Sequence, residues 1–511
     1  MSFHVRRIEE EPRRRLRWRS FIVGALEIGK PLMGWYGLWK ERKEKEHVKK
    51  QRVMALKRLL LVLVAIFFAF LLLAGTVKAL MSVHFLSFGT ITSFAGSELP
   101  TDANGYINLL LIGQGNRDHE GRDLTDTIIV ASIDPTDSKS VVLLSLPRDV
   151  FFLKTAKMGK GKINSFYRDY KNYLQYRQGM EPEDAAVEAL RELGTEVGQN
   201  LGMEIHHTVK VNFTAFVEAV DALDGIDIDV PEDITDSEYP DENYGYEAFT
   251  LSRGMQHLDG ATALKYARSR HSTSDFSRSA RQQQLIKALG QKAKEGGYLK
   301  DPDFITQMIR TLSQNVETTM SLREMIGLAD LAQKLERDRV ITMQLNDRNA
   351  LYDGFVEPGG FLYAPPRSLF DGAAVLLPVS IPEFPVTWRQ PQAFVKLLLH
   401  TRSAYLANPR INILNNGAPS GAARVLATEL FRYGFNVDLI ANATLPEEQT
   451  QSLVFAGSPG HENLALFFAS LLKFAKTEKP AALPEGKVAD ITIILGKEYK
   501  YTPIQNLVPT S

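Results

Sequence analysis

The stretch Ile107-Asn-Leu-Leu-Leu-Ile-Gly113 decides how this sequence folds. It is a short, almost continuous apolar run that ends at a glycine, which is typical of a strand buried on both faces. Two more apolar runs follow, Thr127–Ile133 and Val141–Leu146, and a turn at 134–137 joins them. Three buried strands in close succession predict the centre of a sheet.

Helix-forming segments surround these strands along the chain. Residues 182–198 begin with a proline in the first turn, and residues 213–223 place aromatic and aliphatic side chains on one side. The alternating run Ile226–Val230 predicts another strand, whereas the acidic, tyrosine-rich residues 232–249 predict a surface loop. Residues 302–338 predict two amphipathic helices. Strands interleaved with helices on both sides of a sheet predict an α/β sandwich.

A second, smaller unit follows in the C-terminal part of the chain. Residues 346–408 are rich in proline, glycine and aromatic residues and predict a linker or tail. Residues 409–511 predict a smaller α/β domain with a strand–helix–strand unit, without a cluster of catalytic residue types. Its expected elements are strands at 411–414, 435–440 and 490–495 and a helix at 421–432.

An apolar segment near the N-terminus predicts a membrane anchor. Residues 59–77 are nineteen residues without a charge. This length is close to the roughly 20 residues that cross a bilayer as a helix. Residues 1–58 carry 17 Lys and Arg against 7 Asp and Glu, a net charge of +10. By the positive-inside rule, 1–58 is a basic cytoplasmic tail, 59–80 a single transmembrane helix, 81–104 a spacer, and the remainder extracytoplasmic. The basic tail could also bind anionic lipid or nucleic acid, but we expect its role to be the setting of topology.

The composition excludes several classes of chemistry. The 511 residues include no cysteine, so disulfides, thiolate catalysis and cysteine-bound zinc or iron–sulfur sites are absent. The sequence also lacks a Walker lysine, a His-Glu-x-x-His metal motif and a Gly-x-Ser-x-Gly elbow. Gly113-Gln-Gly115 is a poor dinucleotide fingerprint. His206-His207 is more typical of a strand pair than of a metal site.

An arginine-rich run at residues 266–284 is the most informative stretch for function. Its charged members are four arginines and one acid: Arg268, Arg270, Asp275, Arg278 and Arg281. The planar guanidinium group donates two parallel hydrogen bonds to a phosphate or carboxylate. We expect a strand or loop that leads into a helix near Ser277 and directs these groups to one polyanion. The alternative is that they form ion pairs that stabilise the fold.

Two aspartates stand at the ends of predicted strands. Asp126 precedes one strand, and Asp149 ends another directly after Arg148. Acids at strand ends commonly hold Mg²⁺, which also bridges phosphate oxygens. Capping or a surface ion pair is the alternative, and it would be preferable for either acid alone. With Arg148 adjacent and an arginine run elsewhere, a phosphate site is the better interpretation.

These residues carry a resemblance. From Ile107 to about Leu289 the sequence resembles the LytR-CpsA-Psr family of membrane-anchored phosphotransferases. The supporting segments are Asn108–Gly113, Asp126-Thr127, Leu144–Asp149, Lys162–Asn164, Val211–Phe213 with Phe216, Val220–Leu223, Tyr266–Arg270 and Asp275–Gln283. Residues 409–496 resemble the LytR C-terminal domain. One departure is Gly115, which stands where the family has an acid; Asp118 or Glu120 is the candidate substitute.

The resemblance implies a fold and a reaction. The fold is a three-layer αβα sandwich around a mixed central sheet over residues 105–345. The reaction moves a glycopolymer from a polyprenyl-pyrophosphate carrier to peptidoglycan as a phosphodiester. The rivals are a polyprenyl-pyrophosphate hydrolase and a non-catalytic wall-binding or regulatory protein. A pyrophosphate diester carries about two negative charges, which several arginines and one Mg²⁺ neutralise.

The resemblance also assigns roles to residues. The catalytic group is Arg148, Asp149, Arg268, Arg270 and Asp275. The substrate-binding group is Arg117, Lys162, Arg278, Arg281 and Gln282. The metal ligands are Asp126 and Asp118. Asp149 or Asp275 orients arginines or acts as the general base, and these two alternatives stay open.

Overall fold

The computed structural model describes residues 99–509 apart from 116–123, 241–244, 270–274, 299–307, 309–314, 337, 347–359, 380–385, 444 and 447. The predicted cytoplasmic tail, the transmembrane helix at 59–80 and most of the spacer at 81–104 lie outside the described residues. Within the described part, no helix combines the length and the apolar character needed to cross a membrane.

A mixed sheet of six strands forms the centre of the N-terminal of the two α/β units. Its strand order is β11-β6-β1-β2-β3-β12. The bounds are β1 Ile107–Gln114, β2 Thr125–Ile133, β3 Val141–Ser145, β6 His207–Asn212, β11 Val316–Thr318 and β12 Val340–Gln344. β1 pairs parallel with β6 and antiparallel with β2, which pairs antiparallel with β3, and β3 pairs parallel with β12. The carboxyl ends of β1, β3, β6 and β12 therefore meet at one edge.

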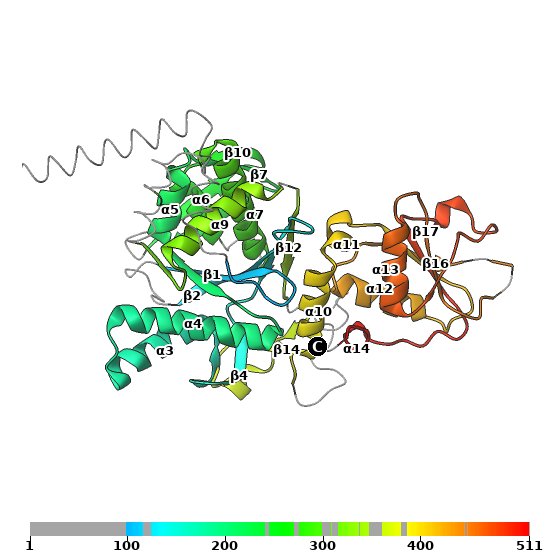
Figure 1. Ribbon diagram of the computed structural model, residues 1–511, viewed down its shortest axis with the longest axis horizontal. Helices are drawn as coiled ribbons and strands as arrows, with labels where there is room; N and C mark the ends of the chain where they lie inside the picture. Colours follow the sequence, from blue (N-terminus) through cyan, green and yellow to red (C-terminus); the bar gives the residue numbers. More distant parts are fainter. Residues whose placement is uncertain are drawn as a thin grey trace, which may run out of the picture. The chain divides into compact units, whose positions relative to one another are not determined.

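Helices cover both faces of this sheet, as the sequence predicted (Figure 1). On one face lie α3 Ile163–Gln178 and α4 Pro182–Leu201. On the other lie α5 Phe213–Asp221, α6 Gly260–Arg268, α7 Asp275–Glu295 and α9 Leu322–Lys334. Alternate residues of β1 serve the two sides: Leu110 and Ile112 pack in the cluster that contains α3 and α4, whereas Leu109 packs in the cluster that contains α9.

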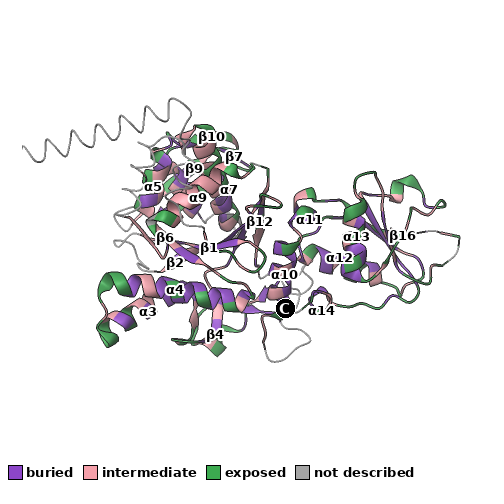
Figure 2. Cartoon of the chain, viewed as in Figure 1, coloured by how far each residue is buried: buried purple, intermediate pink, exposed green. Residues whose placement is uncertain are grey.

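The strands are the most buried part of the fold (Figure 2). Both faces of β1 and β2 are covered, so their runs of leucine, isoleucine and valine bury almost every side chain. Each such side chain contributes roughly 1.5–3 kcal/mol of burial free energy. The continuous apolar runs in the sequence follow from this double coverage.

The described residues within 232–249 belong to two paired strands instead of the predicted surface loop. The strands are β8 Ile234–Pro240 and β9 Tyr246–Leu251, and they pair antiparallel. Ile234, Tyr239 and Phe249 are buried in a small cluster with β7 Ile226–Val230, which pairs with β10 Gly254–Leu258. The prediction was wrong because acids on the outer face hid the apolar residues of the inner face.

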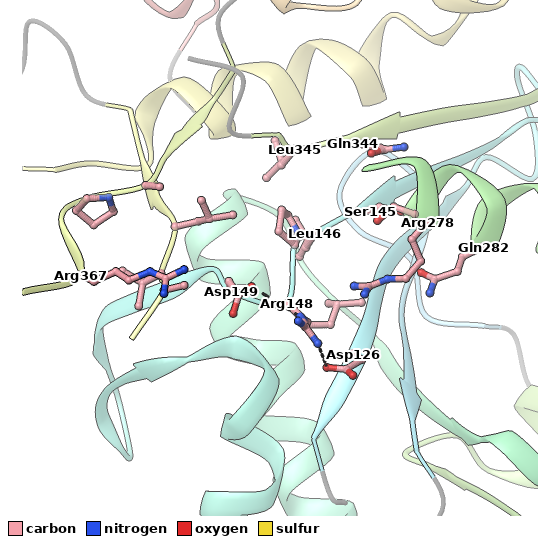
Figure 3. A pocket seen from close by; sticks show the side chains of 18 residues that line it. Asp126, Ser145, Leu146, Arg148, Asp149, Arg278, Gln282, Gln344, Leu345 and Arg367 are labelled. Atoms are coloured by element: carbon pink, nitrogen blue, oxygen red, sulfur yellow. Dashed lines mark hydrogen bonds and ion pairs between the residues drawn. The ribbon is translucent and has the colours of Figure 1, made fainter. Parts of the chain in front are cut away.

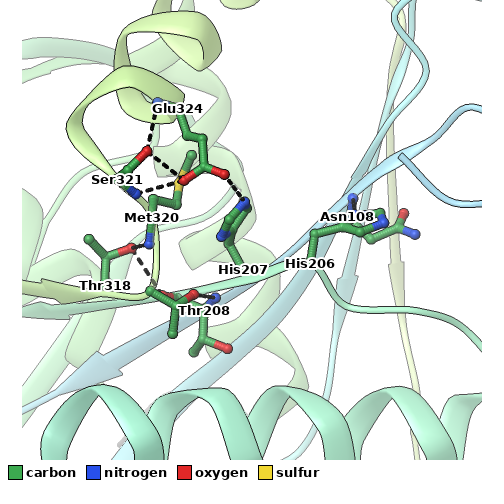
Figure 4. A network of polar contacts seen from close by, with 9 residues as sticks. Asn108, His206, His207, Thr208, Thr318, Met320, Ser321 and Glu324 are labelled. Carbon is green, nitrogen blue, oxygen red and sulfur yellow. Dashed lines mark hydrogen bonds and ion pairs between the residues drawn. The ribbon is translucent and has the colours of Figure 1, made fainter. Parts of the chain in front are cut away.

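The helix α9 confirms the second of the two amphipathic helices predicted within 302–338, and most of the first lies outside the described residues. α9 begins with a capping box, in which Ser321 and Glu324 satisfy each other's backbone N–H groups. Glu324 also lies 3.3 Å from Nε2 of the buried His207 (Figure 4). Nδ1 of His206 accepts a hydrogen bond from the Asn108 N–H at 2.9 Å. Both histidines thus have protein partners, and burial lowers the pKa of His207.

The segment predicted as a linker, 346–408, contains folded elements. They are β13 Leu362–Tyr363, the 3-10 turn η2 Arg367–Phe370, β14 Leu377–Pro378, α10 Arg389–His400 and α11 Arg402–Ala407. In α10, Phe394 and Leu398 are buried, and Phe394 stacks on Phe361 with ring centroids 4.6 Å apart. Prolines and glycines between these short elements hid their apolar spacing in the sequence.

A buried arginine attaches α11 to the six-stranded sheet. NH1 of Arg402 donates to the carbonyls of Ser132 and Ser140 at 2.9 and 3.2 Å, and NH2 donates to Ser132 Oγ at 2.7 Å. Its guanidinium group also lies 4.3 Å from the ring centroid of Tyr106. Arg402 is 3% exposed, so these contacts take the place of water around its guanidinium group.

The C-terminal residues form a second α/β sheet, as expected. Its strand order is β16-β15-β19-β17-β18. The bounds are β15 Ile411–Asn415, β16 Val437–Asn442, β17 Leu453–Ala456, β18 Ala475–Lys476 and β19 Ile491–Leu495. The helices are α12 Ala422–Arg432, α13 Glu462–Leu472 and α14 Ile504–Leu507. The strand–helix–strand unit β15-α12-β16 matches the elements predicted from the sequence.

Candidate active site

A pocket of about 240 Å³ lies where β2 begins and β3 ends (Figure 3). Its polar lining combines acids, arginines, amides and serines from five separate stretches of sequence. These residues are Asp126, Ser145, Arg148, Asp149, Arg278, Ser279, Gln282, Gln344 and Arg367. The pocket is thus at the sheet edge where the carboxyl ends of the parallel strands meet, which is the usual position of ligand sites in open α/β sheets.

Local geometry places Arg148 and Asp149 at the pocket. β3 ends at Ser145, and the Leu146 N–H still donates to the Ile128 carbonyl at 2.9 Å. Pro147 has no N–H, so the ladder stops there and the chain turns. The turn closes with a bond of 3.2 Å from the Val150 N–H to the Pro147 carbonyl.

Arg148 and Asp149 belong to a chain of four charged side chains. NH1 of Arg148 is 3.2 Å from Asp126 Oδ1, and its Nε is 3.7 Å from Asp149 Oδ2. Lys162 Nζ, at the start of α3, donates to Asp149 Oδ1 at 2.7 Å. Arg148 remains 25% exposed. The two acids fix Arg148 while leaving it accessible from the pocket.

The helix α7 supplies the opposite side of the pocket. Arg278 and Gln282 are four residues apart, so they lie on one face of the helix. The Arg278 guanidinium group points toward the Asp126 and Arg148 side chains (Figure 3). Arg278 is only 5% exposed. Two guanidinium groups from distant segments therefore approach one cavity, as the arginine-rich run predicted for Arg278.

Arg281 has a different position from the one predicted. It is 6% exposed, and its Nε donates to the Tyr266 carbonyl at 2.9 Å. Its NH2 donates to the Ser269 carbonyl, so the guanidinium group serves the C-terminal end of α6. Among the described residues it does not line the pocket. Burial lowers the pKa of Arg281, and carbonyl oxygens compensate for the lost hydration.

Arg268 lies at the same edge of the sheet, outside the pocket lining. It ends α6, so it is helical rather than part of the predicted strand or loop. Its guanidinium group lies 4.5 Å from the Phe213 ring centroid and donates to Tyr239 Oη at 2.9 Å. Phe213 also lies near Gly115, where an added Cβ would be 3.6 Å from the ring. Arg268 is therefore stacked beside the end of β1.

Several predicted site residues lie outside the described part of the chain. They are Arg117, Asp118, Arg270 and the alternative acid Glu120. Asp275 is the first residue of α7, two residues before the predicted helix start, but its side chain also lies outside the described part.

The sequence interpretation missed Arg367, Gln344 and Ser145. Gln344 and Ser145 are partners in the β12–β3 ladder, and both end their strands at the pocket. Arg367 comes from the segment that was predicted to be a linker. Its only signal was a cation after two prolines in an apolar surrounding, which by itself does not indicate a site.

The pocket is compatible with one Mg²⁺ ion held together with phosphate oxygens. Asp126 is 45% exposed, and one of its oxygens contacts Arg148. Mg²⁺ sites at phosphates often use only one or two carboxylates and complete their octahedron with water and phosphate oxygens. The described residues contain no group of three or more His, Cys, Asp or Glu that would hold a metal without such help.

Comparison with known proteins identifies the family. A sequence profile of the LytR_cpsA_psr family matches residues 87–358, which is more than half of the 511 residues. The chain belongs to the LytR-CpsA-Psr family. A second profile, described as LytR cell envelope-related transcriptional attenuator, matches residues 408–499. The resemblance found in the sequence is thereby confirmed for both units.

Several relatives of the chain are named as transferases. Bacillus subtilis TagV, a polyisoprenyl-teichoic acid–peptidoglycan teichoic acid transferase, is 28% identical over 225 residues, which are 43% of this chain and 51% of TagV. Bacillus subtilis TagT, with the same activity in its name, is 26% identical over 260 residues, 50% of this chain and 71% of TagT. The chain thus spans about half the length of TagV. The crystal structure of TagV aligns over 59% of this chain and 97% of that chain, with 22% identity and a TM-score of 0.40.

Proposed function

We propose that this protein is a phosphotransferase that moves a glycopolymer from a polyprenyl-pyrophosphate carrier to peptidoglycan. The observation that carries the proposal is the convergence of Arg148 and Arg278 on one pocket, with Asp126 and Asp149 holding Arg148 in place. Two guanidinium groups match the roughly two negative charges of a pyrophosphate diester. The names of TagV and TagT, which give a polyisoprenyl-linked teichoic acid and peptidoglycan as substrates, support a lipid-linked polymer as the donor.

The proposed reaction exchanges one P–O bond for another. An acceptor hydroxyl of peptidoglycan attacks the phosphorus that carries the polymer, and the bond from that phosphorus to the bridging oxygen breaks. The polymer is then joined through a phosphodiester, and polyprenyl phosphate leaves with the bridging oxygen. The hydroxyl proton passes to a carboxylate at the site, for which Asp149 and Asp275 are the candidates. Such transfers depend mainly on positioning and charge stabilisation, so no strong nucleophile is required.

The residues of the pocket divide this work. Arg148 and Arg278 stabilise charge on the phosphoryl oxygens from two sides. Lys162 and Arg148 hold the Asp149 carboxylate between them, which fixes its position in the pocket. Asp126 would hold a Mg²⁺ ion, which supplies further neutralisation of phosphate charge when bound.

The proposal includes a membrane location. The uncharged residues 59–77 and the net charge of +10 before them support a single-pass anchor with the N-terminus in the cytoplasm. Such an anchor would keep the pocket near the leaflet that contains a lipid-linked donor. Protease added to intact spheroplasts should then remove the C-terminal domain, whereas full protection would contradict this topology.

A specific observation keeps a second function in view. Gly115 replaces an acid that the family usually has after the first strand, which favours a protein that binds the lipid-linked polymer without turnover. The test uses the full chain with a labelled lipid-linked glycopolymer and glycan strands. Transfer of label to glycan strands, lost in Arg148→Gln, supports the transferase. Phosphate release without transfer identifies a hydrolase, and saturable binding without either product identifies a binding protein.

A further inference from the structure

Residues 361–379, here called the clasp, form one wall of the pocket. β13 and β14 pair antiparallel through Leu362 with Pro378 and Tyr363 with Leu377. The Val379 N–H extends this pairing by donating to the Phe361 carbonyl at 2.8 Å. The residues between the two strands include η2 and reach the pocket at Ala364, Pro365, Arg367 and Ala374–Leu376.

Main-chain hydrogen bonds attach the clasp to two other segments, one at Asp149 and Phe151 and one at Asn346. The Leu376 N–H donates to the Asp149 carbonyl at 2.8 Å, and the Phe151 N–H donates to the Leu376 carbonyl at 2.9 Å. Shortly after the end of β12, the Asn346 carbonyl accepts from the Leu362 N–H at 2.9 Å. These bonds fix the clasp to the residue next to Arg148.

Apolar contacts make the same connection. Phe361, Leu362 and Val375 are buried, at 2%, 0% and 3% exposure. Phe370, in η2, meets the Phe151 ring edge-on with centroids 5.0 Å apart. Because η2 contains Arg367, this contact holds the start of the Arg367 side chain at a defined place relative to the site.

Arg367 differs from the arginines that stabilise the fold. Its side chain is exposed, and it forms no hydrogen bond or ion pair within the part of the chain that the structure describes. It extends along the Asp149 side of the pocket, whereas Arg278 occupies the opposite side (Figure 3). In a fold-stabilising arginine such as Arg402, each of the three guanidinium nitrogens donates to a protein oxygen. An exposed guanidinium group in the lining of the pocket is instead available to a ligand.

We propose that the clasp delivers Arg367 as a third guanidinium group, which binds the phosphoryl group farther from Arg278 and so selects pyrophosphate over monophosphate. This inference rests on the proposed function. The family profile ends at 358 and the second profile begins at 408, so the clasp lies between the two matched segments. The same selection should help release of the product. Polyprenyl phosphate has one phosphoryl group, does not engage Arg367, and so dissociates more easily.

The test compares two soluble probes, farnesyl pyrophosphate and farnesyl phosphate, by calorimetric titration of the full chain. Arg367→Gln should weaken pyrophosphate binding roughly fivefold to tenfold, because a partly exposed charge-assisted contact is lost. Monophosphate binding should change by less than about twofold, since a single phosphoryl group remains with Arg148 and Arg278. Arg367→Lys, which keeps the charge and loses the fork, should fall between the two.

Two further variants separate the outcomes. Arg424→Gln removes an exposed arginine from α12 and should leave both affinities unchanged. Arg148→Gln tests the proposed function itself. If Arg148→Gln weakens pyrophosphate binding and Arg367→Gln does not, the clasp inference is wrong and the proposed function stands. If the wild type binds neither probe, both fail. Equal losses for both probes, or a lowered melting temperature in Arg367→Gln, also overturn the inference.

Discussion

The two ends of the six-stranded sheet use arginine in opposite ways. At the end where β1 begins and β2 finishes, Arg402 is buried and donates to Ser132 and Ser140. At the other end, Arg148 is held by two acids and remains accessible from a cavity. The residue type is the same, but the partners differ. Each guanidinium nitrogen of Arg402 donates to a protein oxygen, whereas Arg148 faces a space that a ligand can fill.

The closed end is a continuous polar network. Ser132 Oγ, which accepts from Arg402, itself donates to Asn108 Oδ1 at 2.6 Å. The Asn108 side-chain amide donates to the Glu204 carbonyl at 2.9 Å and to Asp102 Oδ2 at 3.1 Å. A network whose members are all satisfied stabilises one arrangement of the fold, and removal of one member leaves buried groups unpaired.

The largest expected effect is on stability at this closed end. Arg402→Met removes a donor from the Ser132 carbonyl, from Ser132 Oγ and from the Ser140 carbonyl, which keeps only the Asp134 N–H, and should reduce the free energy of unfolding by about 3 kcal/mol. Chemical denaturation of the full chain measures this loss. Arg424→Met, on the surface of α12, is the matched control and should change stability by less than about 0.5 kcal/mol. A small effect of Arg402→Met would contradict the comparison.

The same contrast exists between Arg278, which lines the pocket, and Arg281, which is bonded to α6. Arg281→Gln removes a donor from the Tyr266 and Ser269 carbonyls and should reduce stability by about 2 kcal/mol. Affinity for farnesyl pyrophosphate, measured below the melting transition, should change by less than about twofold because Arg281 does not line the described pocket. A specific loss of affinity at unchanged stability would place Arg281 in the site after all.

The smallest expected effect is a pH dependence at His207. Burial lowers the pKa of His207 in the folded protein below its usual value of about 6.5. The unfolded chain therefore binds more protons, so stability is full above about pH 6.5 and falls as the pH drops below it. His207→Gln should flatten this slope between about pH 7.5 and 5.5. Because burial also lowers the pKa of His400, some slope should remain.

Denaturation curves at several pH values measure this slope. The carboxyl group of Glu324, which faces His207, has a pKa below its usual range, so its contribution is lost only at lower pH. An identical slope in the wild type and in His207→Gln would show that this histidine does not titrate differently on folding.

Much of the six-stranded sheet was predictable because its strands follow from the local pattern of apolar residues. The apolar runs of β1, β2 and β3 are buried on both faces, so their composition alone indicates strands. Asp126, Arg148 and Asp149 were predictable for a similar reason, since they stand where those strands begin or end. The family resemblance then connected them with Arg278 and Gln282.

Other features depend on contacts between distant residues and left little trace in the sequence. Arg278 and Arg281 are chemically equivalent in the sequence, but one turn of helix directs the first to the pocket and the second to α6. Arg367 reaches the site only because Leu376 pairs with the main chain at Asp149 and Phe151. α10 is a helix with three buried leucines, yet the prolines that flank it suggested a linker.

The central claim is that Arg148 contacts the pyrophosphate of a lipid-linked donor. Its most direct test is the affinity of the full chain for geranylgeranyl pyrophosphate in the wild type and in Arg148→Gln, measured beside the melting temperature. Loss of one charge-assisted contact should weaken binding by roughly 10- to 100-fold. The melting temperature should shift by less than about 3 °C, because the ion pairs of Arg148 are partly exposed. Unchanged affinity, or an affinity loss that only follows a loss of stability, would contradict the account.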